Sequence, residues 1–376
     1  MPAPYPDALR ARLSEVLRHD LDTPLADSEF DTIARDIFSF QFEHNHAYAA
    51  YCRRRGVVPE QLQHWTAIPP VPTAAFREVA LVAGTPDQGM LRFKTSGTTH
   101  GREKRGVHYI PDPHLYEEAL LPMFAGYLLP DAARPAMISL IPHSAQALDS
   151  SLSRMVSYAA EQVSADAFWF MDADRGLQEL ELEATLRELI ADDSPILIVG
   201  TSFAFVHWLD SLSTRGLRFR LPERSRIMDT GGFKGKSRSV PEAELRAACQ
   251  TFLAVAEPYC INEYGMTELC SQFYDTTLRD RVLDRPASPV RLKRPAPWVR
   301  TRVVDPETLT PVTPGEVGIL QHIDLANLYS VLAVQTEDFG RAHGDAFETL
   351  GRAPGAVPRG CSVAVDLLLQ AVKDTR

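Results

Sequence analysis

The sequence predicts an α/β fold with a helical N-terminal region and a β-rich C-terminal part. Through the middle of the chain, short apolar segments typical of buried strands alternate with amphipathic helical patterns. Before them apolar residues recur at helical spacing, and from about Trp298 onward strand-like segments surround a Pro/Gly turn region. With 376 residues, 45% of them hydrophobic, the chain is long enough to bury a sizeable core.

The first expected element is one long amphipathic helix from Asp27 to Arg55. Asp27 or Ser28 can cap its start, and Gly56 can end it. The apolar positions at helical spacing are Phe30, Ile33, Ile37 and Phe40. The proline-rich segment ⟨AIPPVPTAAFREVAL⟩, residues 67–81, follows as an extended connector, because proline has no backbone N–H to donate within a helix.

The central region predicts a largely parallel sheet. The segments ⟨AMISLI⟩, residues 136–141, and ⟨PILIVG⟩, residues 195–200, suit buried strands, and residues 176–193 have a helical pattern. Strands that alternate with helices form parallel sheets. Further on, ⟨WVRTRVVDPETLTPVTPGEVGILQHI⟩, residues 298–323, predicts two strands around a turn.

Composition excludes several classes of protein. A formal net charge of −10 argues against a general nucleic-acid binder, which needs a basic face. No apolar segment is long enough to cross a bilayer, and the first residues lack the features of a secretory signal. The five cysteines form no CxxC pair, so reduced thiols are expected rather than disulfides. These properties indicate a cytoplasmic globular protein.

The segment ⟨LRFKTSGTTHGREKRGVHYI⟩, residues 91–110, has the composition of a phosphate-binding loop. Its glycines allow close approach of the backbone to a ligand, its hydroxyls add donors, and Arg102 or Lys104 supplies charge. The pattern GxxxxGK[ST] is absent, which argues against a P-loop NTPase. On its own, a loop of this composition is more often a solvated surface turn.

A second polar segment is ⟨CINEYGMTELCSQFY⟩, residues 260–274, which places Tyr264, Gly265, Thr267 and Glu268 within five residues. An aromatic face can stack on a purine, a threonine can bind a phosphate oxygen, and a glutamate can hold Mg²⁺. In isolation the same residues could be a strand end followed by a helix cap.

These two segments resemble signatures of the adenylate-forming superfamily, which includes acyl-CoA synthetases, firefly luciferase and peptide-synthetase adenylation domains. A third match is ⟨VQTEDFGRAHGDAFETLGR⟩, residues 334–352. Over nearly the whole chain the closer resemblance is to LuxE-type acyl-protein synthetases, which activate fatty acids for the bacterial fatty-acid reductase complex. Segments such as ⟨FSFQFEHNHAYAAYC⟩, ⟨DTGGFKGKSR⟩ and ⟨RGCSVAVD⟩ carry it. His100 departs from the pattern, because it stands where the loop usually has its next glycine.

The resemblance implies ATP and Mg²⁺ as cofactors, and it implies a role for each matching residue. The residues expected at the phosphates are Thr95, Ser96, Gly97, Thr98, Thr99, Gly101 and Lys104, with Thr267 at the α-phosphate. Those expected beside the adenine are Gly231, Gly232, Tyr264 and Gly265. Glu268 would hold the metal, Asp338 the ribose, and Cys361 would accept the acyl group as a thioester.

The resemblance also implies a domain plan and a reaction. Residues 1–90 would form a helical N-terminal region, 91–350 the adenylate-forming ATP-binding core, and 351–376 a short tail that carries Cys361 on a flexible approach, in place of a full C-terminal lid domain. A fatty or other carboxylic acid would become an acyl-adenylate and then a protein thioester. A partner such as an acyl reductase or an acyl carrier would receive the acyl group.

Several alternatives stay open at this stage. The chain could be a truncated phenylacetate-type acyl-CoA ligase or a non-catalytic nucleotide-binding subunit. Cys361 could be a structural cysteine, as is expected of Cys249, Cys260 and Cys270. Three further candidates have two interpretations each. His143 could face the substrate carboxylate or be structural, and His207 with Trp208 could line an acyl pocket or belong to a helix core.

Overall fold

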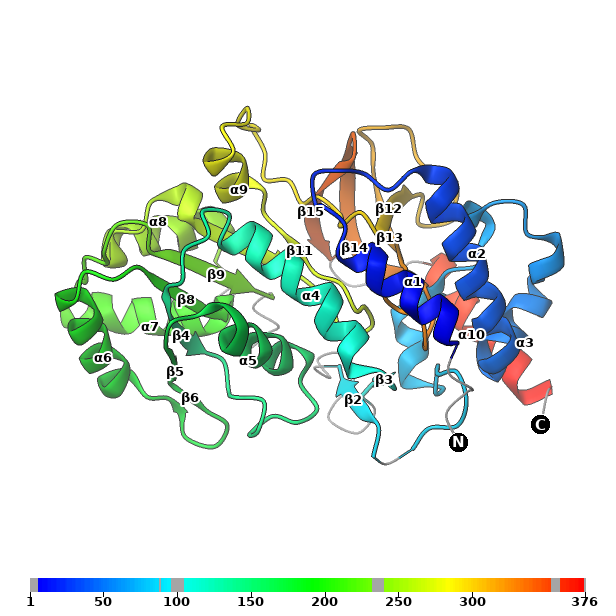
Figure 1. Cartoon of the computed structure of the whole chain (residues 1–376), viewed down its shortest axis with the longest axis horizontal. Helices are drawn as coiled ribbons and strands as arrows, with labels where there is room; N and C mark the ends of the chain where they lie inside the picture. Colours follow the sequence, from blue (N-terminus) through cyan, green and yellow to red (C-terminus); the bar gives the residue numbers. More distant parts are fainter. Residues whose placement is uncertain (1–5, 88, 96–104, 232–239, 353–358, 375–376) are drawn as a thin grey trace. The chain divides into compact units, whose positions relative to one another are not determined.

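The computed structural model (Figure 1) describes residues 6–87, 89–95, 105–231, 240–352 and 359–374, with side chains in the last segment from residue 364 onward. By its contacts the chain divides into two compact units. Unit 1 comprises Met1–Pro122, Met266–Ser271 and Leu292–Arg376, and unit 2 comprises Met123–Gly265 and Gln272–Arg291. The division at residues 90 and 350 that the sequence suggested stays a prediction.

Unit 2 is built on a six-stranded sheet with the order β11-β10-β9-β8-β4-β5. Its strands are β4 (Ala136–Leu140), β5 (Ala167–Trp169), β8 (Ile196–Thr201), β9 (Arg226–Thr230), β10 (Cys260–Tyr264) and β11 (Phe273–Tyr274). All neighbours from β10 to β5 pair in parallel, and only β11 pairs antiparallel, with β10. The prediction of a largely parallel sheet with buried strands near 136–141 and 195–200 is therefore confirmed.

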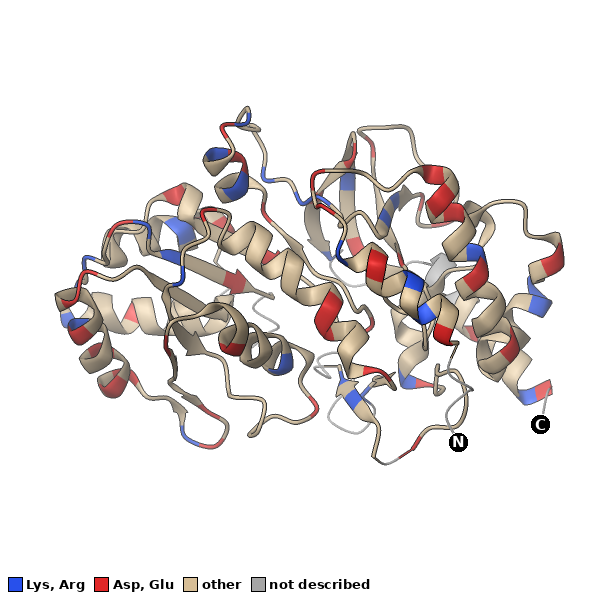
Figure 2. Ribbon diagram, in the orientation of Figure 1, with Lys and Arg blue, Asp and Glu red and all other residues tan. Residues whose placement is uncertain are grey.

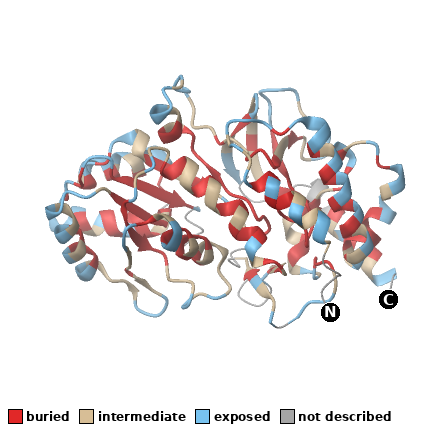
Figure 3. Ribbon diagram, viewed as in Figure 1, coloured by how far each residue is buried: buried red, intermediate tan, exposed pale blue. Residues whose placement is uncertain are grey.

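Helices cover both faces of this sheet (Figure 1). The helices are α4 (Pro113–Leu128), α5 (Ser151–Val163), α6 (Glu179–Ala191), α7 (Ser202–Arg215) and α8 (Glu242–Leu253). Side chains of α6, α7 and α8, among them Leu186, Trp208 and Leu253, form one core with the strands. On the other face α5 contacts β11 through Met155, whose sulfur accepts a hydrogen bond from Tyr274 Oη at 3.6 Å. Figure 3 shows the central strands buried throughout.

The strand order of unit 2 defines where a ligand would bind. From β4 the chain passes to β5 on one side and then, through α6, to β8 on the other side. Such a reversal leaves a crevice at the carboxyl ends of the two central strands, where doubly wound proteins bind their ligands. The loop after β4 and the start of α7 after β8 therefore border the expected ligand-binding edge.

Unit 1 contains a five-stranded sheet with the order β1-β14-β13-β12, and β15 pairs with β14. The strands are β1 (Val71–Pro72), β12 (Val299–Val304), β13 (Val317–Asp324), β14 (Ala333–His343) and β15 (Ala346–Arg352). β12 and β13 pair antiparallel around the Pro/Gly turn region, which confirms the two strands predicted there. The short β1 joins β14 in parallel, so the proline-rich connector supplies an edge strand.

The helices of unit 1 correct one prediction. In place of one helix from Asp27 to Arg55 there are α2 (Asp27–His44) and α3 (His46–Arg54), and Ala26 rather than Asp27 or Ser28 is the N-cap of α2. Asn45 breaks the helix because its side chain accepts a hydrogen bond from Tyr48 N and caps α3, while its amide donates to Ser330 O at 3.1 Å.

The remaining elements are short, apart from α1 (Asp7–Leu17) and α10 (Arg359–Asp374). They are η1 (Pro59–Gln61), η2 (Trp65–Ala67), η3 (Thr73–Arg77), β2 (Leu91–Lys94), β3 (Val107–Ile110), β6 (Met171–Asp172), β7 (Gly176–Leu177), η4 (Glu257–Tyr259) and α9 (Thr277–Val282). Acidic and basic side chains are interspersed along α1 and α2 (Figure 2). None of the helices in the described ranges has an apolar stretch that would span a bilayer.

One buried ion pair fixes the amino end of β9. Arg226 is fully buried and donates to both carboxylate oxygens of Asp131, at 2.9 and 3.0 Å, and to Leu128 O at 2.8 Å. Burial would raise the pKa of Asp131, but hydrogen bonds from Arg226 and Arg224 outweigh it and hold this pKa well below its ordinary value. The carboxylate is therefore ionised and compensates the buried guanidinium.

This arrangement predicts that two substitutions in the same ion cluster lower the free energy of unfolding by different amounts. Asp131→Asn leaves the buried Arg226 charge uncompensated and should lower the free energy of unfolding by about 3–5 kcal/mol. Arg224→Gln removes a half-exposed partner of the same carboxylate and should cost under about 1 kcal/mol. Chemical denaturation measures both values, and equal costs would show that burial of Arg226 does not set the energetics.

Candidate functional site

The predicted phosphate loop begins and ends on a paired hairpin in unit 1. β2 and β3 pair antiparallel, and beyond them Thr95 N donates to Gly106 O while Gly106 N donates to Thr95 Oγ1, each at 2.9 Å. The other residues predicted in this loop lie outside the described part of the chain: Ser96, Gly97, Thr98, Thr99, His100, Gly101, Arg102 and Lys104. Of the loop, the structure therefore places Thr95 and the two ends.

Thr267 and Glu268 are held through their backbone carbonyls. His108 Nδ1 lies 2.7 Å from Thr267 O, and Asn327 Nδ2 donates to Glu268 O at 2.9 Å. Burial lowers the pKa of His108 to about 4, so the ring is neutral at pH 7 and the nitrogen that faces the carbonyl is the protonated one. Both contacts engage the backbone of Thr267 and Glu268 and not their side chains.

The next residues of this segment are held by a buried carboxylate. Asp324, at the end of β13, accepts hydrogen bonds from Cys270 N at 3.0 Å and from Ser271 N and Oγ at 2.9 Å. Trp298 Nε1 donates to the same Ser271 hydroxyl at 3.0 Å. Burial raises the pKa of Asp324 to about 6, against the lowering effect of these hydrogen bonds. The carboxylate thus anchors the segment that carries Glu268.

Glu268 is a buried carboxylate with cations nearby. Burial raises its pKa to about 7, although the charges of Arg352 and Arg77 oppose that increase. Arg77 is the last residue of η3, and its side chain packs with that of Thr95 against Gly106. Within the described part of the chain Arg77 forms no ion pair. The structure therefore brings Thr95, Glu268 and an unpaired cation together in unit 1.

Asp338, the predicted ribose ligand, lies on β14 opposite Arg352 of β15. Its Oδ1 accepts a hydrogen bond from Arg352 Nε at 3.1 Å, and Arg352 also pairs with Glu337 at 3.4 Å. Arg352 thus connects Asp338 electrostatically with Glu268. A ribose that binds Asp338 would have to share the carboxylate with this guanidinium.

A single buried carboxylate, that of Glu268, is a donor of the kind that Mg²⁺ uses together with phosphates and water. Among the residues that the structure describes, no group of three or more His, Cys, Asp or Glu side chains could hold a metal ion. Mg²⁺ is commonly bound through one or two carboxylates together with substrate phosphates and water. Glu268, close to the ends of the predicted phosphate loop, supplies one such carboxylate.

The residues predicted beside the adenine belong to unit 2. Gly231 follows β9 with φ of +73°, a backbone conformation that favours glycine, whereas Gly232 lies outside the described residues. The ring of Tyr264 lies 5.8 Å from that of Phe273. A Cβ at Gly265 would come within 2.2 Å of a carboxylate oxygen of Glu263, so a larger residue there would require the Glu263 side chain to move.

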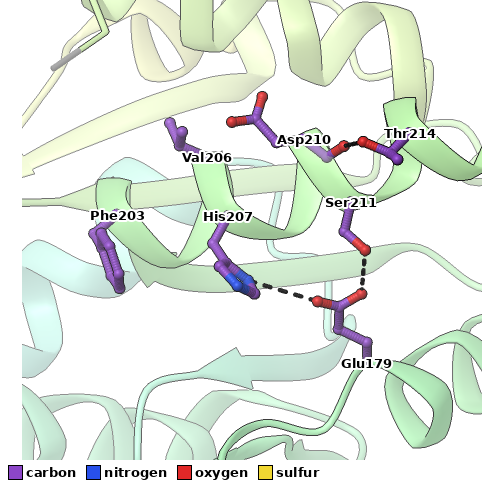
Figure 4. Close-up of a pocket in the computed structure, with 7 residues that line it drawn as sticks. All are labelled: Glu179, Phe203, Val206, His207, Asp210, Ser211 and Thr214. Atoms are coloured by element: carbon purple, nitrogen blue, oxygen red, sulfur yellow. Dashed lines mark hydrogen bonds and ion pairs between the residues drawn. The ribbon is translucent and has the colours of Figure 1, made fainter. Parts of the chain in front are cut away.

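The structure places His143 and the pair His207 and Trp208, whose roles the sequence left open. His143, in the loop after β4, is half-buried, and its Nδ1 accepts a hydrogen bond from Ala145 N at 3.1 Å. Its ring meets that of Trp169 edge-on at 4.8 Å, at the carboxyl end of the sheet. Trp208 is fully buried in the core, in agreement with the helix-core interpretation, whereas His207 is exposed, faces Glu179 and lines a surface cavity (Figure 4).

The cysteines divide into two groups. Cys52, Cys249, Cys260 and Cys270 are buried, as expected for core residues. Burial raises the pKa of Cys52 to about 12 and that of Cys270 well above its usual value. A hydrogen bond with Cys260 and burial together raise the pKa of Cys249. The thiols of Cys52, Cys249 and Cys270 are therefore poor nucleophiles at neutral pH.

The backbone of Cys361 lies in the first turn of α10. This helix docks on α3, where Arg54 donates to Asp374 at 2.7 Å and to Gln370 at 2.9 Å. The flexible approach expected after Arg352 falls on residues 353–358, outside the described part of the chain, and from Arg359 onward the chain is helical. The predicted tail thus ends in a docked helix.

Comparison with known families identifies the chain. The sequence pattern of the family "Acyl-protein synthetase, LuxE" matches residues 26–369, which is most of the chain. The chain belongs to the LuxE acyl-protein synthetase family. Its relatives in this family include the "Long-chain-fatty-acid--luciferin-component ligase" of Aliivibrio fischeri, 24% identical over 92% of this chain and 90% of the relative. The protein of that name from Vibrio harveyi is 20% identical over 91% of this chain and 88% of the relative.

Solved structures agree on the fold. A 2-hydroxyisobutyryl-CoA ligase in the postadenylation state superimposes with a TM-score of 0.64 over 90% of this chain and 71% of that one, at 15% identity. The open conformation of the same ligase gives a TM-score of 0.63 over 91% of this chain and 83% of that one. This LuxE-family synthetase therefore has the adenylate-forming fold that the sequence predicted, and as a family member it is a ligase.

The buried Glu268 carboxyl should make the stability of this synthetase depend on pH. Since the pKa of Glu268 rises from 4.5 to about 7 on folding, the folded protein keeps a proton that the unfolded chain loses, and stability falls as pH rises through that window. Glu268→Gln removes this loss. Its free energy of unfolding should exceed the wild-type value by on the order of 3 kcal/mol at pH 8 and by much less at pH 5.

Urea denaturation at both pH values measures the difference. Glu316→Gln, the same substitution at an exposed turn, is the control and should show no pH-dependent gain. A gain for Glu268→Gln that is equal at pH 5 and pH 8 would contradict the raised pKa.

Proposed function

We propose that this LuxE-family synthetase uses ATP and Mg²⁺ to convert a long-chain fatty acid into an acyl-adenylate and then transfers the acyl group to its own Cys361. The observation that carries the proposal is the cluster in unit 1. A buried carboxylate, Glu268, lies close to two cations, Arg77 and Arg352, and to the paired ends of a loop rich in hydroxyls and glycines. The family membership supports acid activation as the reaction.

The nucleotide would bind through the residues that the family resemblance assigns to it. Thr95 and the loop that follows it would bind the β- and γ-phosphates, and Thr267 would donate its hydroxyl to the α-phosphate. Tyr264, with Gly231 and Gly265, would border the adenine, and Asp338 would accept hydrogen bonds from the ribose hydroxyls. Gly232, Ser96, Gly97, Thr98, Thr99, Gly101 and Lys104 keep the roles expected from the sequence.

Glu268 would hold the metal. When bound, Mg²⁺ neutralises phosphate charge and polarises the α-phosphate. Only the ionised carboxylate can bind it, so the apparent affinity for Mg²⁺ should rise with pH as Glu268 loses its proton near pH 7. The neutral state of Glu268 at lower pH would keep the empty site stable.

Adenylation would form one P–O bond and break another. An oxygen of the fatty-acid carboxylate attacks the α-phosphorus of ATP, and the bond from that phosphorus to the bridging oxygen breaks, so pyrophosphate leaves with the electron pair. Arg77 and Lys104 would offset the negative charge that accumulates on the phosphates. Arg77 suits this role because it packs beside Thr95 and has no ion-pair partner among the residues described.

Cys361 would complete the cycle. Its thiolate attacks the acyl carbonyl carbon, the bond to the phosphate oxygen breaks, and AMP leaves. The four other cysteines are buried, which leaves Cys361 as the best acceptor in the chain. Its place in the first turn of a 16-residue helix favours the thiolate, because helix N-termini stabilise negative charge.

The acyl thioester would then pass to a partner such as an acyl reductase or an acyl carrier protein. The names of the two relatives, which mention a long-chain fatty acid, support that substrate class. The cytoplasm would be the place of reaction, in agreement with reduced cysteines and with the lack of a membrane-spanning helix in the described segments.

The role of Glu268 predicts a catalytic defect. Glu268→Gln should lower the rate of fatty-acid-dependent ATP–pyrophosphate exchange by about 10²- to 10³-fold, since loss of one charge-stabilising contact has an effect of that size. Glu316→Gln should exchange at the wild-type rate. If Glu268→Gln folds and exchanges as fast as the control, Glu268 does not hold the metal.

The acceptor role of Cys361 predicts that the two half-reactions separate. Cys361→Ser should form acyl-adenylate at the wild-type rate but lose the hydroxylamine-sensitive acyl label on the protein, because an unactivated hydroxyl is a far weaker nucleophile than a thiolate. Cys52→Ser is the control and should keep the label if the protein folds. A labelled Cys361→Ser protein, or transfer by the wild type to free CoA with no protein-bound stage, would favour an acyl-CoA ligase instead.

A further inference from the structure

A buried polar network in unit 2 is not used by the proposed function. It joins the carboxyl ends of three neighbouring strands, β8, β9 and β10. Ser202 Oγ, at the start of α7, lies 2.8 Å from Asp229 Oδ2. Asn262 Nδ2 donates to the same Asp229 oxygen at 2.9 Å. Ser202 and Asp229 are 4% and 6% exposed, so solvent does not compete for these contacts.

The network ends on the glycine turn that follows β9. The same Ser202 Oγ lies 2.8 Å from Gly231 O. Gly231 has a φ of +73°, and its carbonyl belongs to the peptide through which the chain leaves the sheet. A hydrogen bond to this carbonyl restrains the backbone of Gly231 at the point where the chain leaves β9. Ser202 therefore links the start of α7 to the turn.

The geometry also shows how Asp229 contributes. A serine hydroxyl has one proton, yet Ser202 Oγ has two oxygen neighbours at 2.8 Å. With Asp229 ionised, Ser202 shares its proton between Asp229 Oδ2 and Gly231 O; with Asp229 protonated, the carboxyl donates to Ser202, whose own proton then binds Gly231 O. Burial raises the pKa of Asp229 to about 6, although hydrogen bonds from Asn262 and Ser202 oppose that increase. Burial thus increases the protonated fraction well above that of an exposed aspartate.

The position of the network agrees with a ligand-related role. Ser202 follows β8, one of the two central strands at the point where the strand order reverses, and such points border the ligand crevice of doubly wound sheets. A network that only stabilised the sheet would not need the contact with Gly231, which lies just after the last residue of β9. Here one hydroxyl extends past the end of β9 to the turn.

We propose that Ser202, supported by Asp229 and Asn262, is a positioning residue that holds the Gly231 turn in the orientation that binds the adenine ring of ATP. The inference rests on the proposed function, which places this turn beside the nucleotide. Ser202 acts on ATP through Gly231 and touches neither the reacting phosphate nor the acyl carbonyl. Its loss should therefore weaken ATP binding and leave the chemical step intact.

Ser202→Ala tests the proposal against a matched control on the same helix. Ser211, nine residues further along α7, also bonds through its hydroxyl, to Glu179 at 2.5 Å, in a surface cavity of about 390 Å³ away from the turn (Figure 4). Ser202→Ala should raise the Kd for ATP, measured by calorimetry, and the KM for ATP in pyrophosphate exchange by about fivefold, the size typical of one lost hydrogen bond. Its kcat should stay within about twofold, and Ser211→Ala should change none of these values.

Two further variants keep the test informative if Ser202→Ala folds poorly. Ser202→Thr retains the hydroxyl and should restore the wild-type KM, whereas Ser202→Cys has a similar volume but a weaker donor and should give an elevated KM. The proposal is overturned if Ser202→Ala and Ser202→Cys both have the same KM for ATP as Ser211→Ala. It is also overturned if the Ser202 variants lower only kcat. Wild-type protein is assayed first. If it shows no pyrophosphate exchange, the proposed function fails; if it exchanges and the Ser202 variants behave like the control, only this inference fails.

Discussion

The hydrogen bonds that Asp324 accepts hold the segment on which the candidate site depends. Three and four residues after Thr267, the chain is fixed by the backbone N–H groups of Cys270 and Ser271 and by the Ser271 hydroxyl, all bound to one buried carboxylate. Asn327, in the turn after the same strand, holds the carbonyl of Glu268. Because a buried carboxylate is tolerated only when its hydrogen bonds are satisfied, the anchor and the segment stabilise each other. The side chain of Glu268 is thereby kept in a buried place that it would not occupy on its own.

In the proposed function, burial of the Glu268 carboxyl lowers the stability of the protein without its ligands. Burial keeps Glu268 half-protonated near pH 7, although Arg77 and Arg352 favour its charged form. A metal ion and a nucleotide would supply the missing compensation, and the empty protein tolerates the site by holding a proton there. In unit 2, burial likewise raises the pKa of Asp229, although hydrogen bonds from Asn262 and Ser202 oppose that increase. Strongly perturbed carboxyl groups of this kind are concentrated at functional sites.

Local patterns predicted the central strands, because apolar runs are visible in the sequence itself. Clustered polar residues likewise predict a ligand-binding role for the segment from Tyr264 to Glu268, which stays a prediction. The break at Asn45 was missed, since apolar spacing continues across it and only the contact with Ser330 reveals the cap. Arg77 was missed for a related reason. In the sequence it belongs to a proline-rich connector, and its closeness to Glu268 arises from packing between residues far apart in the chain. Charge and burial of this kind depend on tertiary contacts that one-dimensional spacing does not contain.

In the proposed reaction, the carboxylate of a fatty acid attacks the α-phosphate of ATP. Transfer of a carboxyl oxygen to AMP would follow from that attack and can be measured. Wild-type protein is given ATP and a long-chain fatty acid labelled with ¹⁸O in its carboxyl group, and the nucleotide product is examined by mass spectrometry. The account predicts AMP that carries one ¹⁸O atom, because one carboxyl oxygen stays on phosphorus when Cys361 takes the acyl group. Label in inorganic phosphate together with ADP, or no AMP with any fatty acid, would contradict it.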